Sequence, residues 1–128
     1  MKEAFGIVDL FSGPGGLGEG FCADPGAHGG FGIDVSGEKD PVAHETLRLR
    51  AFLRRFGDQL PPEYIDFLNR GGSEPNWSKL YPREWAEAEN EALNLTLGEQ
   101  ETATILDERI AEIRQRRGDR VVLIGGPP

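Results

Sequence analysis

The segment from Asp9 to Phe21 carries the residue types and spacing that best fit binding chemistry. Gly13, Gly15 and Gly18 follow a short apolar run and precede a helical pattern. Glycine lets the backbone turn sharply and approach a ligand closely because it has no Cβ. In an α/β sheet, the loop at the carboxyl end of a strand is the usual ligand position. We therefore expect a nucleotide-like ligand at this loop.

Two classes of ligand fit the glycine spacing. The three glycines satisfy the G-x-G-x-x-G pattern of dinucleotide-binding proteins, and Glu38 lies about twenty residues beyond the last of them. That pattern opens directly at a strand end, however, whereas Asp9, Phe11 and Ser12 intervene here before the first glycine. A carboxylate and an aromatic ring suit a cationic sulfonium amino acid joined to adenosine better than they suit a pyrophosphate.

Three motifs, in order along the whole chain, resemble those of the DNA (cytosine-5) methyltransferases, which bind S-adenosylmethionine. Residues 9–17 resemble the first motif, and Glu38-Lys39-Asp40 resembles the acidic second motif. Gly125-Gly126-Pro127-Pro128, after an apolar run, resembles the start of the catalytic motif. In the family this motif continues with Cys-Gln, so the chain stops one residue before the catalytic cysteine.

The resemblance implies a Rossmann-like α/β methyltransferase fold with a mostly parallel open sheet and flanking helices. It also implies methyl transfer to C5 of cytosine in DNA, on a base flipped out of the duplex. A cysteine thiolate adds to C6 of that base in the family, which is nucleophilic catalysis. We expect residues 1–128 to be the cofactor-binding half of such an enzyme, of the bacterial restriction-modification kind, with no catalytic residue and no activity alone. DNA contact is expected through the missing C-terminal part.

Several cofactor contacts follow from the resemblance residue by residue. Phe11 would lie against the adenine, with the stem of Lys39 beside it. Glu38 would accept hydrogen bonds from both ribose hydroxyls, a use of a carboxylate that dinucleotide enzymes share. The loop around the methionine portion would be shaped by Ser12, Gly13, Gly15, Gly16 and Leu17.

Other assignments concern residues at the margins of these motifs. Asp9 would orient the loop or face the ammonium group of the cofactor, and a purely structural cap is an equal alternative. Pro127 and Pro128 would form a rigid wall that positions the missing cysteine. The family's third motif places an acidic residue near the adenine amino group. Glu99, which follows the third strand, and Asp107, by its distance from the final prolines, are the candidates.

Composition narrows the expected partners. The chain has 14 Lys and Arg against 22 Asp and Glu, a net charge of -8. This argues against binding DNA alone, because that affinity comes from neutralising phosphates. Cys22 is the only cysteine, which excludes an internal disulfide and a multi-cysteine metal site, and its helical context indicates packing rather than catalysis. With no long apolar run and no signal peptide, a cytoplasmic protein without membrane contact is expected.

Hydrophobic periodicity predicts the elements that must position the loop. Strands are expected over 5–10, 31–38, 93–97 and 121–124, and helices over 14–23, 41–56 and 83–95. A further helix carries the stripe Leu106, Ile110 and Ile113 and stops at Gly118, while Asp40 and Pro41 open the helix over 41–56. The arginines of the helix over 41–56 are interpreted as a solvated face rather than as a DNA-phosphate patch; they are Arg48, Arg50, Arg54 and Arg55. Residues 58–97 are interpreted as an insertion anchored by Trp77, Tyr81 and Trp85.

In the expected strand order, the fourth strand lies beside the first and its outer edge is left for a fifth strand that the chain lacks. We therefore expect a complementary chain or self-association at this edge. Two alternatives to the methyltransferase remain. A fragment of an NAD(P)-dependent oxidoreductase explains the glycines and Glu38 but not Phe11 or the Gly-Gly-Pro-Pro ending, and a non-catalytic module would bind the cofactor or a partner chain.

Overall fold

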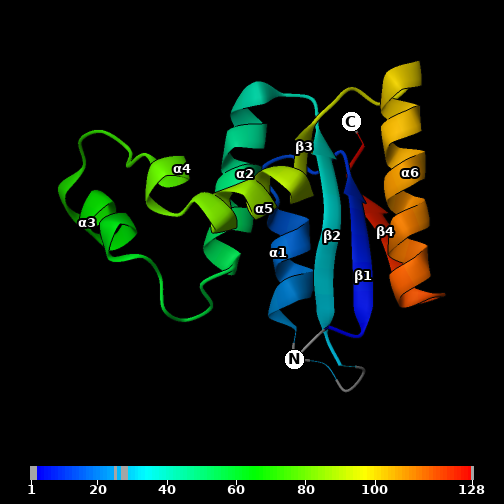
Figure 1. The fold of residues 1–128 in the computed structure, drawn as a ribbon, viewed down its shortest axis with the longest axis horizontal. Coiled ribbons are helices and arrows are strands. Elements are labelled where there is room, and N and C mark those ends of the chain that lie inside the picture. Colours follow the sequence, from blue (N-terminus) through cyan, green and yellow to red (C-terminus); the bar gives the residue numbers. More distant parts are fainter. Residues whose placement is uncertain (1–2, 25, 27–28, 128) are drawn as a thin grey trace.

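A four-stranded parallel sheet with helices on both faces forms the body of the protein in the computed structural model, which describes residues 3–24, 26 and 29–127 (Figure 1). The strands lie in the order β3-β2-β1-β4. They are β1 (Phe5–Leu10), β2 (Phe31–Glu38), β3 (Ala92–Asn94) and β4 (Val121–Gly125). The helices are α1 (Gly16–Ala23), α2 (Pro41–Arg54), α3 (Pro62–Arg70), α4 (Trp77–Leu80), α5 (Pro82–Glu91) and α6 (Gln100–Arg117). The predicted α/β class with a parallel sheet is confirmed and is consistent with a Rossmann-like fold.

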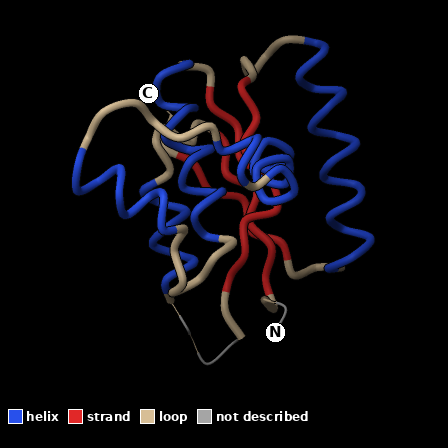
Figure 2. Tube along the Cα trace, turned by 60° about the vertical axis from the view of Figure 1, so that its left-hand side comes forward, coloured by secondary structure: helices blue, strands red, loops and turns tan. Residues whose placement is uncertain are grey.

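The helices divide between the two faces of the sheet. Figure 2 shows α6 alone on one side and the other helices on the opposite side. Under α6, Val8 and Val35 pack with Ile113. On the other side, Phe52 is fully buried and belongs to a core cluster with Trp77 and Ala88. The strand ends that carry the glycine loop are therefore held by apolar contacts from both faces.

A β-bulge in β2 changes the face on which its residues lie. Ile7 pairs with Ile33, but the next residue, Val8, pairs with Val35, so Asp34 is an extra residue. Two consecutive residues of a bulge share one face, and Val35 accordingly packs under α6. Simple alternation along the strand expected over 31–38 would place Phe31, Ile33 and Val35 on one face, and the bulge moves Val35 to the other. Asp34 instead accepts from Arg117, whose Nε lies 2.6 Å from Asp34 Oδ2.

The segment predicted as an insertion shares its core with the sheet. Its α3 and α4 project from the body (Figure 1), whereas α5 packs on α2 and β3 pairs with β2. Trp77 is only 3% exposed, and its ring lies 5.1 Å from that of Phe52. Tyr81 and Trp85 also contact Phe52, which confirms the predicted aromatic cluster. The chain leaves α5 at Glu91, earlier than predicted, because 92–94 pair as a strand.

Helix boundaries follow the local signals in the sequence. Asp40 Oδ1 accepts a hydrogen bond from Val42 N at 2.9 Å, and Pro41 occupies the first helical position of α2. Gly118, with φ 62°, ends α6. β4 lies beside β1 as expected, and its other side is unpaired within the described part of the chain. No helix in that part has the length and apolar character needed to cross a bilayer.

Candidate functional site

Hydrogen bonds to β2 and within the loop itself hold the loop after β1 in place. Ser12 N donates to Gly37 O at 3.1 Å, and Ser12 Oγ donates to Asp9 O at 2.7 Å. Gly15 N in turn donates to Ser12 O at 3.1 Å, which closes a tight turn before α1. The loop is thus positioned by the end of the neighbouring strand before any ligand is present.

Gly15 is a position in this loop where the backbone favours glycine. Its φ is 95°, a left-handed conformation that side chains disfavour. A Cβ there would lie 2.9 Å from Leu47 Cδ1, so the loop also approaches α2 too closely for a side chain. Gly16, by contrast, begins α1 with open space around it. Gly13 also has a positive φ, of 56°, and a Cβ on the buried Gly18 would lie 2.7 Å from Ile33 Cδ1, so three glycines of the pattern have a structural reason and Gly16 has none.

Phe11 is held in an unusual backbone conformation at the end of β1. Its φ is 55°, and no other non-glycine residue in the described ranges has a positive φ. For a bulky residue this conformation costs free energy and persists where the surroundings enforce it. The side chain is 42% exposed, so burial of the ring does not account for the conformation. The backbone turns Phe11 toward a pocket rather than into the core.

Glu38 connects the glycine loop to the start of α2. Its Oε1 accepts from Gly13 N at 2.9 Å, and its Oε2 accepts from Asp40 N at 2.8 Å. A carboxylate offers about four acceptor positions, so each oxygen can accept a further donor. Glu38 can therefore hold the loop in place through Gly13 and also bind hydroxyl groups of a ligand.

A pocket of about 460 Å³ lies at the carboxyl ends of the strands. Its lining combines apolar side chains with the Glu38 carboxylate. The lining residues are Phe11, Gly13, Gly37, Glu38, Lys39, Leu95, Thr96, Leu97 and Gly126. The structure thus brings together four of the predicted site residues: Phe11, Gly13, Glu38 and Lys39. An apolar pocket with few convergent polar groups is typical of small-molecule sites.

Other predicted residues lie outside this lining. Ser12, Gly15, Gly16 and Leu17 shape the loop or begin α1, and Leu17 is 50% exposed. Pro127 follows Gly126 and is exposed, and Pro128 lies outside the described residues.

Neither acidic candidate for the adenine contact lines the pocket. Glu99 is the exposed N-cap of α6, and Asp107 is exposed further along that helix. The wall after β3 is formed instead by Leu95, Thr96 and Leu97. Sequence reasoning assigned these residues to the strand itself, and the signal that could have identified them is their position directly after a short strand.

Asp9 is buried beneath the loop without a hydrogen-bond partner. It is 1% exposed, and neither carboxylate oxygen has a partner. Its neighbour across the sheet, Ser36, also has an unpartnered buried hydroxyl. Burial raises the pKa of Asp9 from 3.8 to about 6, offset in part by the nearby Ser12 hydroxyl. Asp9 does not line the ligand pocket, and its carboxylate accepts no hydrogen bond from the loop, so the structure supports neither the ligand contact nor the side-chain cap; the hydrogen bond that links Asp9 to the loop is made by its backbone oxygen with Ser12.

The arginines at the end of α2 are engaged in ion pairs. Arg54 lies 2.9 Å from Glu19 and 3.1 Å from Glu91, and Arg55 lies 3.2 Å from Glu87. Their interpretation as a solvated face is wrong, because both side chains link α2 to neighbouring helices. Cys22, nearby, is half-buried, and burial raises the pKa of its thiol, which agrees with a packing role.

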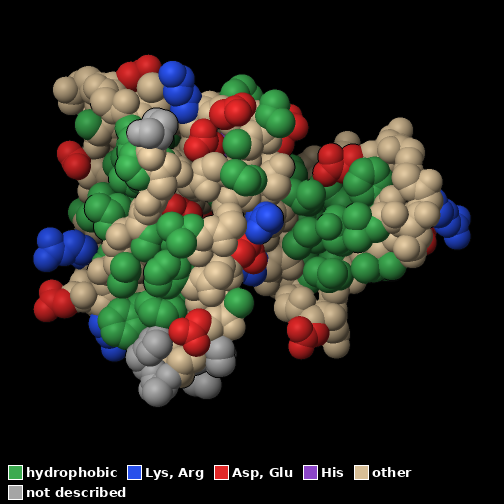
Figure 3. Space-filling view, turned by 180° about the vertical axis from the view of Figure 1, so that it is seen from behind, with side chains coloured by type: hydrophobic (Ala, Val, Ile, Leu, Met, Phe, Trp, Pro, Cys, Tyr) green, Lys and Arg blue, Asp and Glu red, His purple; other side chains and the backbone are tan. Residues whose placement is uncertain are grey.

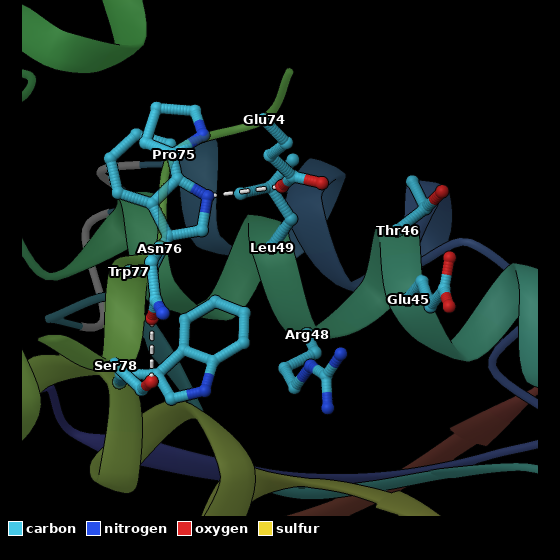
Figure 4. Close-up of a pocket in the computed structure, with 10 residues that line it drawn as sticks. Glu45, Thr46, Arg48, Leu49, Glu74, Pro75, Asn76, Trp77 and Ser78 are labelled. Carbon is cyan, nitrogen blue, oxygen red and sulfur yellow. Dashed lines mark hydrogen bonds between the residues drawn. The ribbon is translucent and has the colours of Figure 1, made fainter.

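A second pocket, of about 360 Å³, lies between α2 and the segment around α4 (Figure 4). Arg48 lies with its guanidinium carbon 4.8 Å from the ring centre of Trp85. Trp77 Nε1 donates to Glu74 Oε1 at 3.0 Å. This pocket contains none of the predicted site residues, and the acidic Glu45 and Glu74 beside Arg48 disfavour a nucleic acid phosphate there.

Within residues 3–24, 26 and 29–127, no group of three or more His, Cys, Asp or Glu side chains is arranged to hold a metal ion. Comparison of the chain with known protein families, with curated proteins and with solved structures finds no significant match.

Proposed function

We propose that this chain is the S-adenosylmethionine-binding part of a DNA (cytosine-5) methyltransferase. The observation that carries the proposal is the pocket at the strand ends, where Phe11, Glu38 and Lys39 meet. These residues belong to two separate motifs of the sequence, and Gly126 of the third motif lines the same pocket. Three motifs that converge on one pocket are stronger support than any one glycine pattern.

The chemistry of the pocket suits an adenosyl group. Phe11 supplies an aromatic face, and Leu95 and Leu97 supply apolar surface in the same lining as Glu38 and Lys39. The free acceptor positions of Glu38 would bind the ribose hydroxyls. The methionine portion would extend toward the glycine loop, where Gly13 leaves open space for close approach. When bound, S-adenosylmethionine would supply the methyl group that is transferred.

In this proposal the chain performs only the cofactor half of the reaction. Its net charge of -8 makes it a poor DNA-binding surface. Its one cysteine, Cys22, is a half-buried thiol in α1, distant in sequence from the Gly-Gly-Pro-Pro ending. The nucleophile and the DNA-binding surface would belong to a complementary part of the enzyme.

Calorimetric titration of the chain with S-adenosylmethionine, S-adenosylhomocysteine and NAD tests the proposal. We expect saturable binding of the first two and none of NAD. The variant Phe11→Ala should weaken binding about tenfold, since stacking of a base on an aromatic ring contributes about 1–3 kcal/mol. The matched control is Phe67→Ala, on the projecting helix α3, which should leave affinity unchanged.

An NAD(P)-dependent oxidoreductase fragment is the second candidate, favoured by the placement of Glu38 at the carboxyl end of β2. Binding of NAD alone would establish it and overturn the methyltransferase proposal. Absence of binding for all three ligands would contradict a preformed cofactor site in this chain.

A further inference from the structure

The ligand pocket has two walls that come from different strands. Glu38 and Lys39 follow β2, while Leu95 to Leu97 follow β3. β3 has three residues and pairs with β2 only from Ser36 to Glu38. Such a short ladder provides few backbone hydrogen bonds to hold the second wall in place.

Asn94 joins these two walls directly. Its Nδ2 donates to Glu38 O and to Lys39 O, each at 2.9 Å. Both partners are carbonyl oxygens, so only the NH2 end of the amide can make these bonds. Leu95 N adds a third bond, to Glu38 O at 3.2 Å. The Asn94 side chain therefore supplies two of these three hydrogen bonds.

The position of Leu95 depends on this arrangement. Its Cδ1 lies 2.9 Å from the place that a Cβ on Gly37 would occupy, so the side chain packs closely on the backbone of β2. Leu95 and Gly37 both line the pocket. A shift of the residues after β3 would therefore change the shape of the pocket directly.

We propose that Asn94 is a positioning residue that sets the separation of the two pocket walls and thereby the fit of the nucleoside portion of the ligand. The identity of that ligand rests on the proposed function. Asn94 is exposed and does not itself line the pocket. It acts through Lys39 and through the residues that follow it.

Two variants test this role. Asn94→Ala removes both donated hydrogen bonds, and Asn94→Asp keeps the size of the side chain but places a carboxylate against two carbonyl oxygens. The matched control is Asn69→Asp, an equal change of charge on the exposed surface of α3. Hydrogen exchange is measured over 38–42 and 92–97 without ligand, and affinity is measured for S-adenosylhomocysteine and for adenosine.

We expect both Asn94 variants to exchange faster over 92–97 and to bind both ligands about tenfold more weakly, as the loss of two hydrogen bonds predicts. Equal losses for the two ligands locate the defect at the nucleoside portion that both contain, and unchanged exchange outside 38–42 and 92–97 separates this effect from a general loss of structure. The control should match the native chain in both measurements.

Unchanged exchange over 92–97 would overturn the proposal, and so would faster exchange with unchanged affinity. If the native chain binds neither ligand but the Asn94 variants exchange faster, the proposed function fails while the connection between the walls stands.

Discussion

At the scale of single residues, Asp9 links burial to the pH dependence of stability. Its pKa is about 6 in the folded protein and 3.8 ordinarily. Between these values the folded chain binds more protons at Asp9 than the unfolded chain does. The free energy of unfolding therefore falls as pH rises through this window, and the contribution of neutral Asp9 is lost above pH 6.

Asp9→Asn removes this titration. At pH 7.5 we expect the variant to be about 3 kcal/mol more stable than the native chain, since the pKa of Asp9 rises from 3.8 to about 6 on folding and each pKa unit corresponds to about 1.4 kcal/mol. The gain should shrink at pH 4.5, where Asp9 in the folded chain is already neutral. Urea denaturation at both pH values measures the difference, and Asp66→Asn on exposed α3 serves as control. A variant that is less stable at pH 7.5 would show that the carboxylate has a stabilising partner.

At Phe11, the cost of the strained backbone and the contribution of the ring to ligand binding can be measured separately. Phe11→Gly should raise the free energy of unfolding by about 1 kcal/mol, because glycine adopts a positive φ without steric cost. The same change should weaken binding of S-adenosylhomocysteine, because the aromatic face is lost. Thermal unfolding and titration of one preparation give both values. A loss of stability would instead mean that the ring contributes packing that outweighs the strain.

At the scale of elements, the turn between β1 and α1 depends on one glycine more than on its neighbour. Gly15→Ala should destabilise the protein by about 1–3 kcal/mol, because of its φ of 95° and the approach of Leu47. Gly16→Ala, one residue later at the start of α1, should be neutral or slightly stabilising. Chemical denaturation of the two variants compares the positions directly. Equal effects would show that the turn is not the constraint.

At the scale of the whole molecule, β4 has a side that is unpaired within the described part of the chain and is therefore open to association. Leu123 is 67% exposed on this strand, and an apolar edge strand is a template for pairing with another chain. We expect the chain to self-associate as its concentration rises. Leu123→Lys should shift sedimentation velocity profiles toward the monomer.

A second apolar surface provides the matched control for this prediction. Figure 3 shows hydrophobic side chains gathered over the projecting part of the molecule, where Ile65 and Leu68 are 42% and 60% exposed. Leu68→Lys makes the same substitution away from the sheet. If it dissociates the protein and Leu123→Lys does not, association occurs through α3 instead of through β4.

Much of the fold could be predicted because it depends on local signals. The run over 5–10 forms β1, Asp40 and Pro41 begin α2, and Gly118 ends α6, as predicted. Each signal works through neighbours a few residues away, such as a cap or an apolar stripe. Phe11, Gly13, Glu38 and Lys39 likewise belong to short motifs, and they line one pocket because the carboxyl ends of parallel strands share one edge of the sheet.

Local sequence signals are therefore enough to predict the order and type of most elements and the residues of the glycine loop. Three features follow only from the tertiary structure. They are the bulge at Asp34, the lining of the pocket by residues 95–97 in place of the expected Glu99, and the lack of a hydrogen-bond partner for the Asp9 carboxylate. The tertiary structure also decided the pairing of Arg54 with Glu19 and Glu91. These features depend on residues that are distant in sequence and adjacent only in the folded chain, so no local pattern encodes them.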